Sequence, residues 1–128
     1  MRLMNTKTIC YNFLKKEELM NQVILVGRLV SDPELHVLGS GVKVTTVTLA
    51  VKRPFKSGET NEYETDFLKC TLWSGIAEAT TQYCKKGYTV GIKARLQQKF
   101  YIKEGKKIFS YPEIIAEQIT FINKVKEK

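Results

Sequence analysis

The alternation of apolar and polar residues in the second half of the chain constrains the fold more than any other feature. It runs with a period of two from Thr65 to Trp73 and again from Thr89 to Tyr101. Its apolar positions are Leu68, Cys70 and Leu72 in the first segment and Val90, Ile92, Ala94 and Leu96 in the second. Side chains on a β-strand point alternately to opposite faces. Both segments are therefore predicted to be strands that turn one face toward a core.

Two further strands are predicted in the first half of the chain. Val23 to Val30 is a nearly continuous apolar run that ends at the turn signal Ser31-Asp32-Pro33, which predicts a buried first strand. Val42 to Val51 is rich in valine and threonine, but its apolar positions move from even to odd numbers. We therefore expect one residue to slip near Thr45-Thr46 as a β-bulge.

The remaining segments predict one helix and a final hairpin. Ile76 to Cys84 has the spacing of a short amphipathic helix, which Gly87 closes. Lys103 to Lys107 predicts a hairpin loop, followed by a last strand from Ile108 to Phe121 that Pro112 interrupts. The helix positions expected to face the core are Ile76, Ala79, Thr80 and Tyr83.

Five strand-like segments with one helix between the third and the fourth form the layout of an OB-fold, a five-stranded Greek-key barrel. At 128 residues the chain has room for one such all-β domain, which we expect to extend from residue 20 to residue 123. OB-folds commonly bind oligonucleotides. A fold does not settle a function, so the candidate site has to be argued from its residues.

The two ends of the chain lie outside this expected domain. The run Lys15-Lys16-Glu17-Glu18-Leu19 stands just before a second methionine, Met20. Residues 1–19 are therefore either a translated ribosome-binding sequence ahead of the true start or a native N-terminal extension, helical or disordered. Residues 124–128 form a short basic C-terminus.

The charge balance and the cysteines narrow the class of protein. Twenty-one Lys and Arg against 13 Asp and Glu leave a net charge of +8, which favours nucleic acid first and an acidic membrane surface second. Cys10, Cys70 and Cys84 show no metal-binding or disulfide spacing, so we expect no metal, no cofactor and a reducing cytoplasm. No apolar run reaches the roughly 18–20 residues of a membrane span, and no signal peptide is indicated.

Large aromatic and cationic residues occupy the predicted faces turned away from the core. They are Phe67, Lys69 and Trp73 on the third strand, Lys93, Arg95, Lys99 and Tyr101 on the fourth, and Lys52, Arg53, Phe55 and Lys56 after the second. Unpaired bases stack on aromatic rings for about 1–3 kcal/mol each, while lysine and arginine attract phosphates. This set therefore predicts a site for single-stranded nucleic acid. The alternative for Phe67 and Trp73 is that they pack under a neighbouring subunit or the long loop.

The residues after Met20 resemble bacterial single-stranded-DNA-binding proteins in an ordered series of segments. These are Asn21 to Leu29, Asp32-Pro33-Glu34, Thr48-Leu49-Ala50, Phe67 to Trp73, Ala77-Glu78 and Tyr83 to Gly87. The resemblance implies that Phe55, Phe67, Trp73 and Tyr101 are base-stacking aromatics and that the chain forms a homotetramer. Where the family often has a histidine at a subunit contact this chain has Leu68, and this departure bears on the strength of the tetramer.

The expected function is non-sequence-specific binding and protection of single-stranded DNA at the nucleoid, in replication, repair or recombination. Many relatives also carry an acidic tail that recruits repair and replication enzymes. This sequence ends in Asn123 to Lys128. We therefore expect the tail-dependent partners not to bind.

Two other functions compete with this interpretation. An enzyme would have to rely on scattered carboxylates or on His36, the only histidine, for which the sequence offers no partner. His36 is instead expected to be an exposed loop residue. An OB-fold that binds RNA, or that serves as a primosomal adaptor protein, stays open because stacking surfaces accept either sugar.

Overall fold

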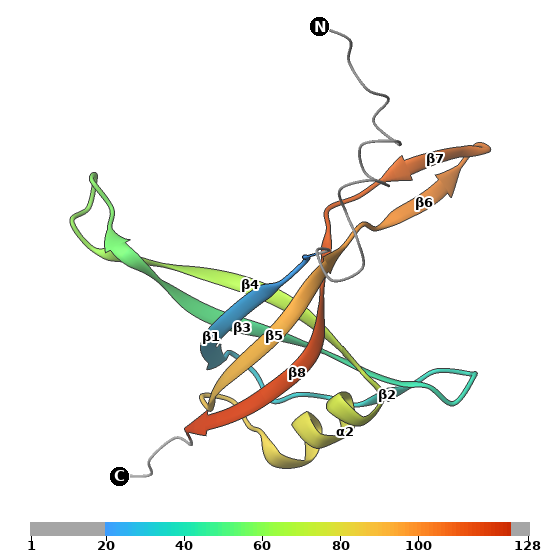
Figure 1. Cartoon of the computed structure of the whole chain (residues 1–128), viewed down its shortest axis with the longest axis horizontal. Coiled ribbons are helices and arrows are strands. Elements are labelled where there is room, and N and C mark those ends of the chain that lie inside the picture. The colour runs from blue at the N-terminus through green and yellow to red at the C-terminus, as the bar shows by residue number, and fades with distance from the viewer. Residues whose placement is uncertain (1–19, 124–128) are drawn as a thin grey trace, which may run out of the picture.

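The computed structural model of the protein describes residues 20–123 and shows a β-barrel closed at one end by a helix (Figure 1). The start of the native chain and the basic C-terminus, considered above, lie outside the described residues. The elements are β1 (Val23–Leu29), β2 (His36–Val37), β3 (Lys43–Lys56), β4 (Tyr63–Trp73), α2 (Ser74–Tyr83), β5 (Thr89–Gln97), β6 (Phe100–Lys103), β7 (Lys106–Phe109) and β8 (Glu113–Asn123).

The five long strands form the predicted OB-fold barrel. The strand order is β1-β5-β8-β4-β3-β2, and an additional pairing of β1 with β3 closes the barrel. All of these pairings are antiparallel except that of β4 with β8. The helix α2 follows β4 directly, so it stands between the third and fourth long strands as predicted. The fold class is therefore confirmed.

The core lies inside the barrel and takes side chains from every long strand and from α2. Its buried members are Leu29, Val47, Leu49, Cys70, Leu72, Ala77, Cys84, Val90, Ile92, Ala94 and Ala116. The apolar positions of β4 and β5 predicted by alternation are thus confirmed as core, except that Leu68 is half-buried and Leu96 is exposed. The buried residues of α2 are Thr80, which the helix periodicity selected, and Ala77, which it did not, whereas Tyr83 is exposed.

The prediction of a fully buried first strand is wrong, because β1 has one face in the core and one face in solvent. Ile24 and Val26 are 71% and 53% exposed, whereas Gly27 and Leu29 are buried. A barrel strand has only one inner face, so a continuous apolar run leaves half of its side chains outside. Gly27 has a geometric role, since a β-carbon there would lie 2.6 Å from the carbonyl oxygen of Ala50 where β1 meets β3.

The predicted bulge near Thr45-Thr46 is also wrong. β3 pairs with β4 without interruption from Val44, opposite Trp73, to Lys52, opposite Thr65, and the irregularity lies further on, between Lys52 and Lys56. The sequence suggested a change of phase because a threonine occupies an inner position. Thr45 is fully buried, and its hydroxyl donates to the carbonyl oxygen of Glu34 at 2.6 Å, which satisfies it there.

The segment from Thr89 to Tyr101 is two strands rather than the single strand that its alternation predicted. β5 ends at Gln97, and Phe100 begins a separate two-stranded hairpin, β6–β7, which projects from the barrel (Figure 1). Glu104 and Gly105 form its turn with positive φ angles of 52° and 75°. The predicted hairpin and the interruption at Pro112 are confirmed, because β8 begins only at Glu113.

Candidate nucleic-acid interface

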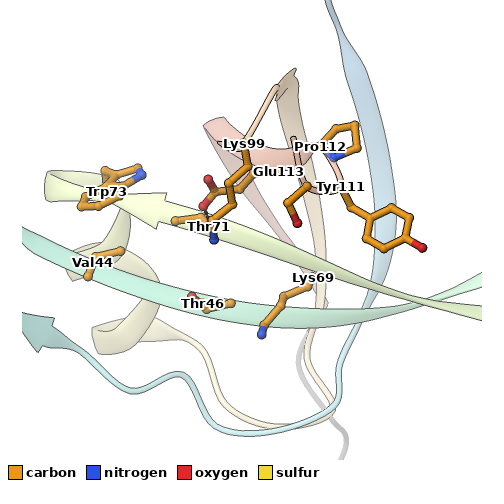
Figure 2. A pocket seen from close by; sticks show the side chains of 10 residues that line it. Val44, Thr46, Lys69, Thr71, Trp73, Lys99, Tyr111, Pro112 and Glu113 are labelled. Atoms are coloured by element: carbon orange, nitrogen blue, oxygen red, sulfur yellow. Dashed lines mark hydrogen bonds between the residues drawn. The ribbon is translucent and has the colours of Figure 1, made fainter. Parts of the chain in front are cut away.

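A groove of about 570 Å³ lies on the outside of the barrel and brings three of the predicted binding residues together. They are Lys69, Trp73 and Lys99. The other residues of the wall are Val44, Thr46, Thr71, Ser110, Tyr111, Pro112 and Glu113 (Figure 2). The groove therefore combines aromatic rings and lysines, as the sequence predicted, with one carboxylate that it did not.

The floor of the groove is the outer face of the β3–β4 pair. Val44 lies opposite Trp73, and Thr46 lies opposite Thr71. Directly opposite residues of an antiparallel pair share a face. Short side chains on β3 thus stand beside the large indole of β4, which is 38% exposed and remains accessible from the groove.

The opposite wall is formed where the β6–β7 hairpin joins the barrel. The amide of Ser110 donates to the carbonyl oxygen of Lys99 at 2.7 Å and closes the base of the hairpin. Tyr111 follows, 89% exposed, with its ring directed away from Trp73 (Figure 2). The sequence analysis did not select Tyr111. Its position beside Pro112, at a break in the strand, was the one feature of the sequence that could have indicated its exposure.

The outer face of β4 continues from the groove along the β3–β4 ribbon, which extends beyond the barrel (Figure 1). We call this face the outer strip: Tyr63, Thr65, Phe67, Lys69, Thr71 and Trp73 of β4, with Lys52 and Lys56 of β3 beside them. At about 3.3 Å per residue the ten steps from Tyr63 to Trp73 span roughly 33 Å. Phe67, in the middle, is 67% exposed.

Tyr63 is a residue of the outer strip that the sequence analysis missed. The ammonium groups of Lys52 and Lys56 lie 5.2 Å and 5.7 Å from the centre of its ring. Two predicted lysines and an aromatic ring therefore occur together at the far end of the strip. Phe55, exposed near the end of β3, lies close to them along the chain.

Arg53 lies among carboxylates instead of with the aromatics. Its Nη2 atom is 2.8 Å from Asp66 Oδ1, and its Nη1 atom is 2.7 Å from Glu64 Oε2. The hydrogen bond from Arg53 lowers the pKa of Asp66, and the same bond raises the pKa of Arg53. Asp66 and Glu64 are on the face of β4 opposite to Phe67. The charge of Arg53 is thus neutralised by two carboxylates on the face of β4 that is opposite to the outer strip.

The structure does not bring Lys93 and Arg95 to the groove. The strand β8 lies between β4 and β5, so the outer faces of the third and fourth long strands are not adjacent. Lys93 stands opposite Ile24 of β1. Arg95 donates to Gln97 and lies 3.9 Å from Glu117. A role for either residue in binding stays a prediction.

Tyr101 lies on the β6–β7 hairpin and not on the outer face of β5, where alternation had placed it. Phe100 and Phe109 pair across the same hairpin, with ring centres 6.3 Å apart. The ammonium group of Lys107 lies 4.1 Å from the centre of the Phe100 ring. The hairpin therefore carries a second group of exposed aromatics and cations, of which the sequence analysis selected only Tyr101.

His36 is not the loop residue that was expected, because it belongs to the short strand β2 and pairs with Val44. It therefore shares the outer face with Val44 and Trp73. Among residues 20–123 no cluster of three His, Cys, Asp or Glu side chains could hold a metal ion. The same part of the chain contains no helix long and apolar enough to cross a membrane.

Comparison of the sequence with known proteins identifies relatives of a single family. A profile of the Single-strand binding protein family matches residues 20–122. Single-stranded DNA-binding protein 3 of Listeria innocua is 45% identical over 105 residues, which are 81% of this chain and 64% of that protein. Single-stranded DNA-binding protein B of Bacillus subtilis is 42% identical over 111 residues, 86% of this chain and 97% of that protein.

A third relative, the single-stranded DNA-binding protein of Halalkalibacterium halodurans, is 43% identical over 105 residues, 81% of this chain and 61% of that protein. The chain thus spans less than two thirds of the Listeria and Halalkalibacterium proteins and almost the whole of the Bacillus subtilis protein. The profile covers the barrel from before β1 to the next-to-last residue of β8. The chain belongs to the single-strand binding protein family.

Proposed function

We propose that this chain binds single-stranded DNA without sequence specificity and protects it during replication, repair or recombination. The observation that carries the proposal is the outer strip with its groove, in which Phe67 and Trp73 are exposed beside Lys69 and Lys99. The names of the relatives, each a single-stranded DNA-binding protein, support it. The function is binding, without a chemical step, and we place it in the cytoplasm at the nucleoid.

Two interactions would provide the binding: aromatic rings contact the bases, and positive charges contact the phosphates. Aromatic rings stack on the flat faces of unpaired bases, which a duplex keeps hidden, and every base offers such a face. When lysines bind phosphates, counterions are released from the nucleic acid. Every nucleotide carries the same phosphate, so this contribution to affinity is independent of sequence. Strips that alternate the two, as at Phe67, Lys69 and Trp73, therefore favour single strands of any sequence.

Titration of the tryptophan fluorescence tests the proposal directly. Trp73 is the only tryptophan and lines the groove. We expect an unlabelled oligo-dT to quench its emission, and an equally long duplex to quench it much less at the same salt concentration. An unchanged emission together with unchanged electrophoretic mobility of the oligonucleotide would contradict the proposal. Competition between oligo-dT and oligo-U at one salt concentration separates DNA binding from the RNA-binding alternative.

The proposal includes assembly as a homotetramer, supported by an apolar surface outside the groove. Ile24 and Val26 are exposed on β1, and Ile122 is exposed on β8, on the other side of β5. Exposed apolar area of this kind marks surfaces that associate. Leu68 lies elsewhere, on the inner face of β4 opposite Leu49.

Sedimentation of the full chain tests the assembly. We expect a tetramer at micromolar concentration and dissociation by Ile24→Glu, because a carboxylate would lose its hydration in the interface. The control is Val37→Glu, a similarly exposed valine on β2 at the other edge of the sheet, which we expect to sediment like the wild type. A monomeric wild type, or equal dissociation by both variants, would argue against this interface.

A further inference from the structure

One carboxylate faces the groove that is proposed to hold a polyanion. Glu113 is the first residue of β8, is half-buried, and lines the groove together with Trp73 and Lys99. A phosphate close to a carboxylate is repelled by it even in water, because the two charges have the same sign. Glu113 is therefore unsuited to the DNA backbone, and its presence needs another explanation.

The carboxylate is held in position by a hydroxyl and not by a cation. Thr71, only 8% exposed, donates from Oγ1 to Glu113 Oε1 at 2.7 Å (Figure 2). Within residues 20–123, no lysine or arginine forms an ion pair with Glu113, although Lys69 and Lys99 line the same groove. In the same part of the chain, no hydrogen bond reaches the second carboxylate oxygen. That oxygen can accept from a bound molecule.

We propose that Glu113 accepts a hydrogen bond from the exocyclic amino group of a base held in the groove beside Trp73. This inference rests on the proposed function and names the bases that the groove prefers. A carboxylate is an acceptor only, and it suits the N4 amino group of cytosine. Uracil and thymine present a carbonyl oxygen at the equivalent position, which repels the carboxylate. The groove therefore favours cytosine over uracil within an otherwise unspecific binding surface.

Oligomers of deoxycytidine and deoxyuridine of equal length test this, because the two bases differ only in their hydrogen-bonding edge. Binding of labelled oligomers to the full chain is measured by anisotropy at one salt concentration and at mildly alkaline pH. We expect the wild type to prefer deoxycytidine, and Glu113→Gln to reduce this preference by roughly 3- to 10-fold. The amide can donate to a carbonyl oxygen, so deoxyuridine should bind more tightly to the variant.

The matched control is Glu117→Gln, which removes the same charge from the same strand outside the groove. Glu117 is exposed and lies near Arg95. We expect this variant to bind both oligomers slightly more tightly, with the wild-type ratio between them. If Glu113→Gln behaves in the same way, its charge acts only as a general repulsion and the inference is wrong.

A second variant covers the possibility that Glu113→Gln disturbs the packing of β8 against β4. Thr71→Val keeps the carboxylate but removes the hydroxyl that positions it, so the preference for deoxycytidine should also fall while binding of deoxyuridine is retained. An unchanged ratio in a folded Thr71→Val protein would contradict the positioning role. Failure of the wild type to bind either oligomer would overturn the proposed function itself, whereas binding with no preference overturns only the role of Glu113.

Discussion

Replacement of Trp73 by alanine should weaken the binding of single-stranded DNA by roughly 5- to 150-fold at a fixed salt concentration. This factor corresponds to the loss of one stacked base, about 1–3 kcal/mol. Trp73 is the natural residue for this test because it lines the groove and is only partly exposed, so a stacked base would cover the rest of the ring. Anisotropy of a labelled oligonucleotide measures the effect without relying on the tryptophan that has been removed.

Two further variants separate stacking from packing. Trp73→Leu retains an apolar side chain next to Val44 and should lose most of the same affinity, with a thermal unfolding midpoint close to that of the wild type. Tyr83→Ala removes an aromatic ring that packs near Phe121, 6.1 Å between ring centres, away from the groove. Tyr83→Ala should leave affinity unchanged. Equal losses in both alanine variants would show that general destabilisation, and not stacking, weakens binding.

Removal of two groove lysines, Lys69→Gln with Lys99→Gln, should flatten the salt dependence of binding. Each phosphate contact contributes about 0.7 to the slope of log affinity against log salt for single strands, so the double variant should lose about 1.4. If both proteins bind equally at about 1 M salt, this difference corresponds to roughly 70-fold weaker binding at about 50 mM. The slope is measured from affinities at several salt concentrations.

The control is Lys85→Gln with Lys86→Gln, which changes the net charge by the same amount in the turn after α2. Both lysines are exposed and lie outside the groove. The backbone amide of Lys86 donates to the carboxylate of Asp32. We expect this pair to leave the slope close to that of the wild type. If the two double variants flatten the slope equally, then the net charge of +8 attracts DNA as a whole and the groove lysines have no particular role.

The candidate site could be predicted from the sequence where it depends on one strand alone. The period of two in β4 was sufficient to put Phe67, Lys69 and Trp73 on one face and Cys70 and Leu72 on the other, because adjacent residues of a strand point in opposite directions. The helix and the break at Pro112 were also predictable, because helical spacing and a proline are local features of the sequence. Each of these features is decided by residues that are neighbours along the chain.

Prediction from the sequence failed for residues whose position depends on which strands are neighbours in the sheet. Alternation predicts that Lys93 and Lys69 are equivalent outer-face residues, but β8 lies between β4 and β5. Alternation predicts that Tyr101 belongs to the same strand as Lys93, but β5 ends at Gln97 and Tyr101 lies in the separate β6–β7 hairpin. No local pattern distinguishes these cases, because strand order and the point of departure are set by pairings between residues far apart in the sequence.

The sequence by itself therefore determined the class of fold and the aromatic and cationic character of the outer strip. Only the tertiary structure decided which residues meet: Lys99 with Trp73 in one groove, Arg53 with Asp66 away from it, and Glu113 with the hydroxyl of Thr71. The physical reason is that side-chain direction follows from the local backbone, whereas the contacts between strands appear only when the barrel closes and brings distant segments together.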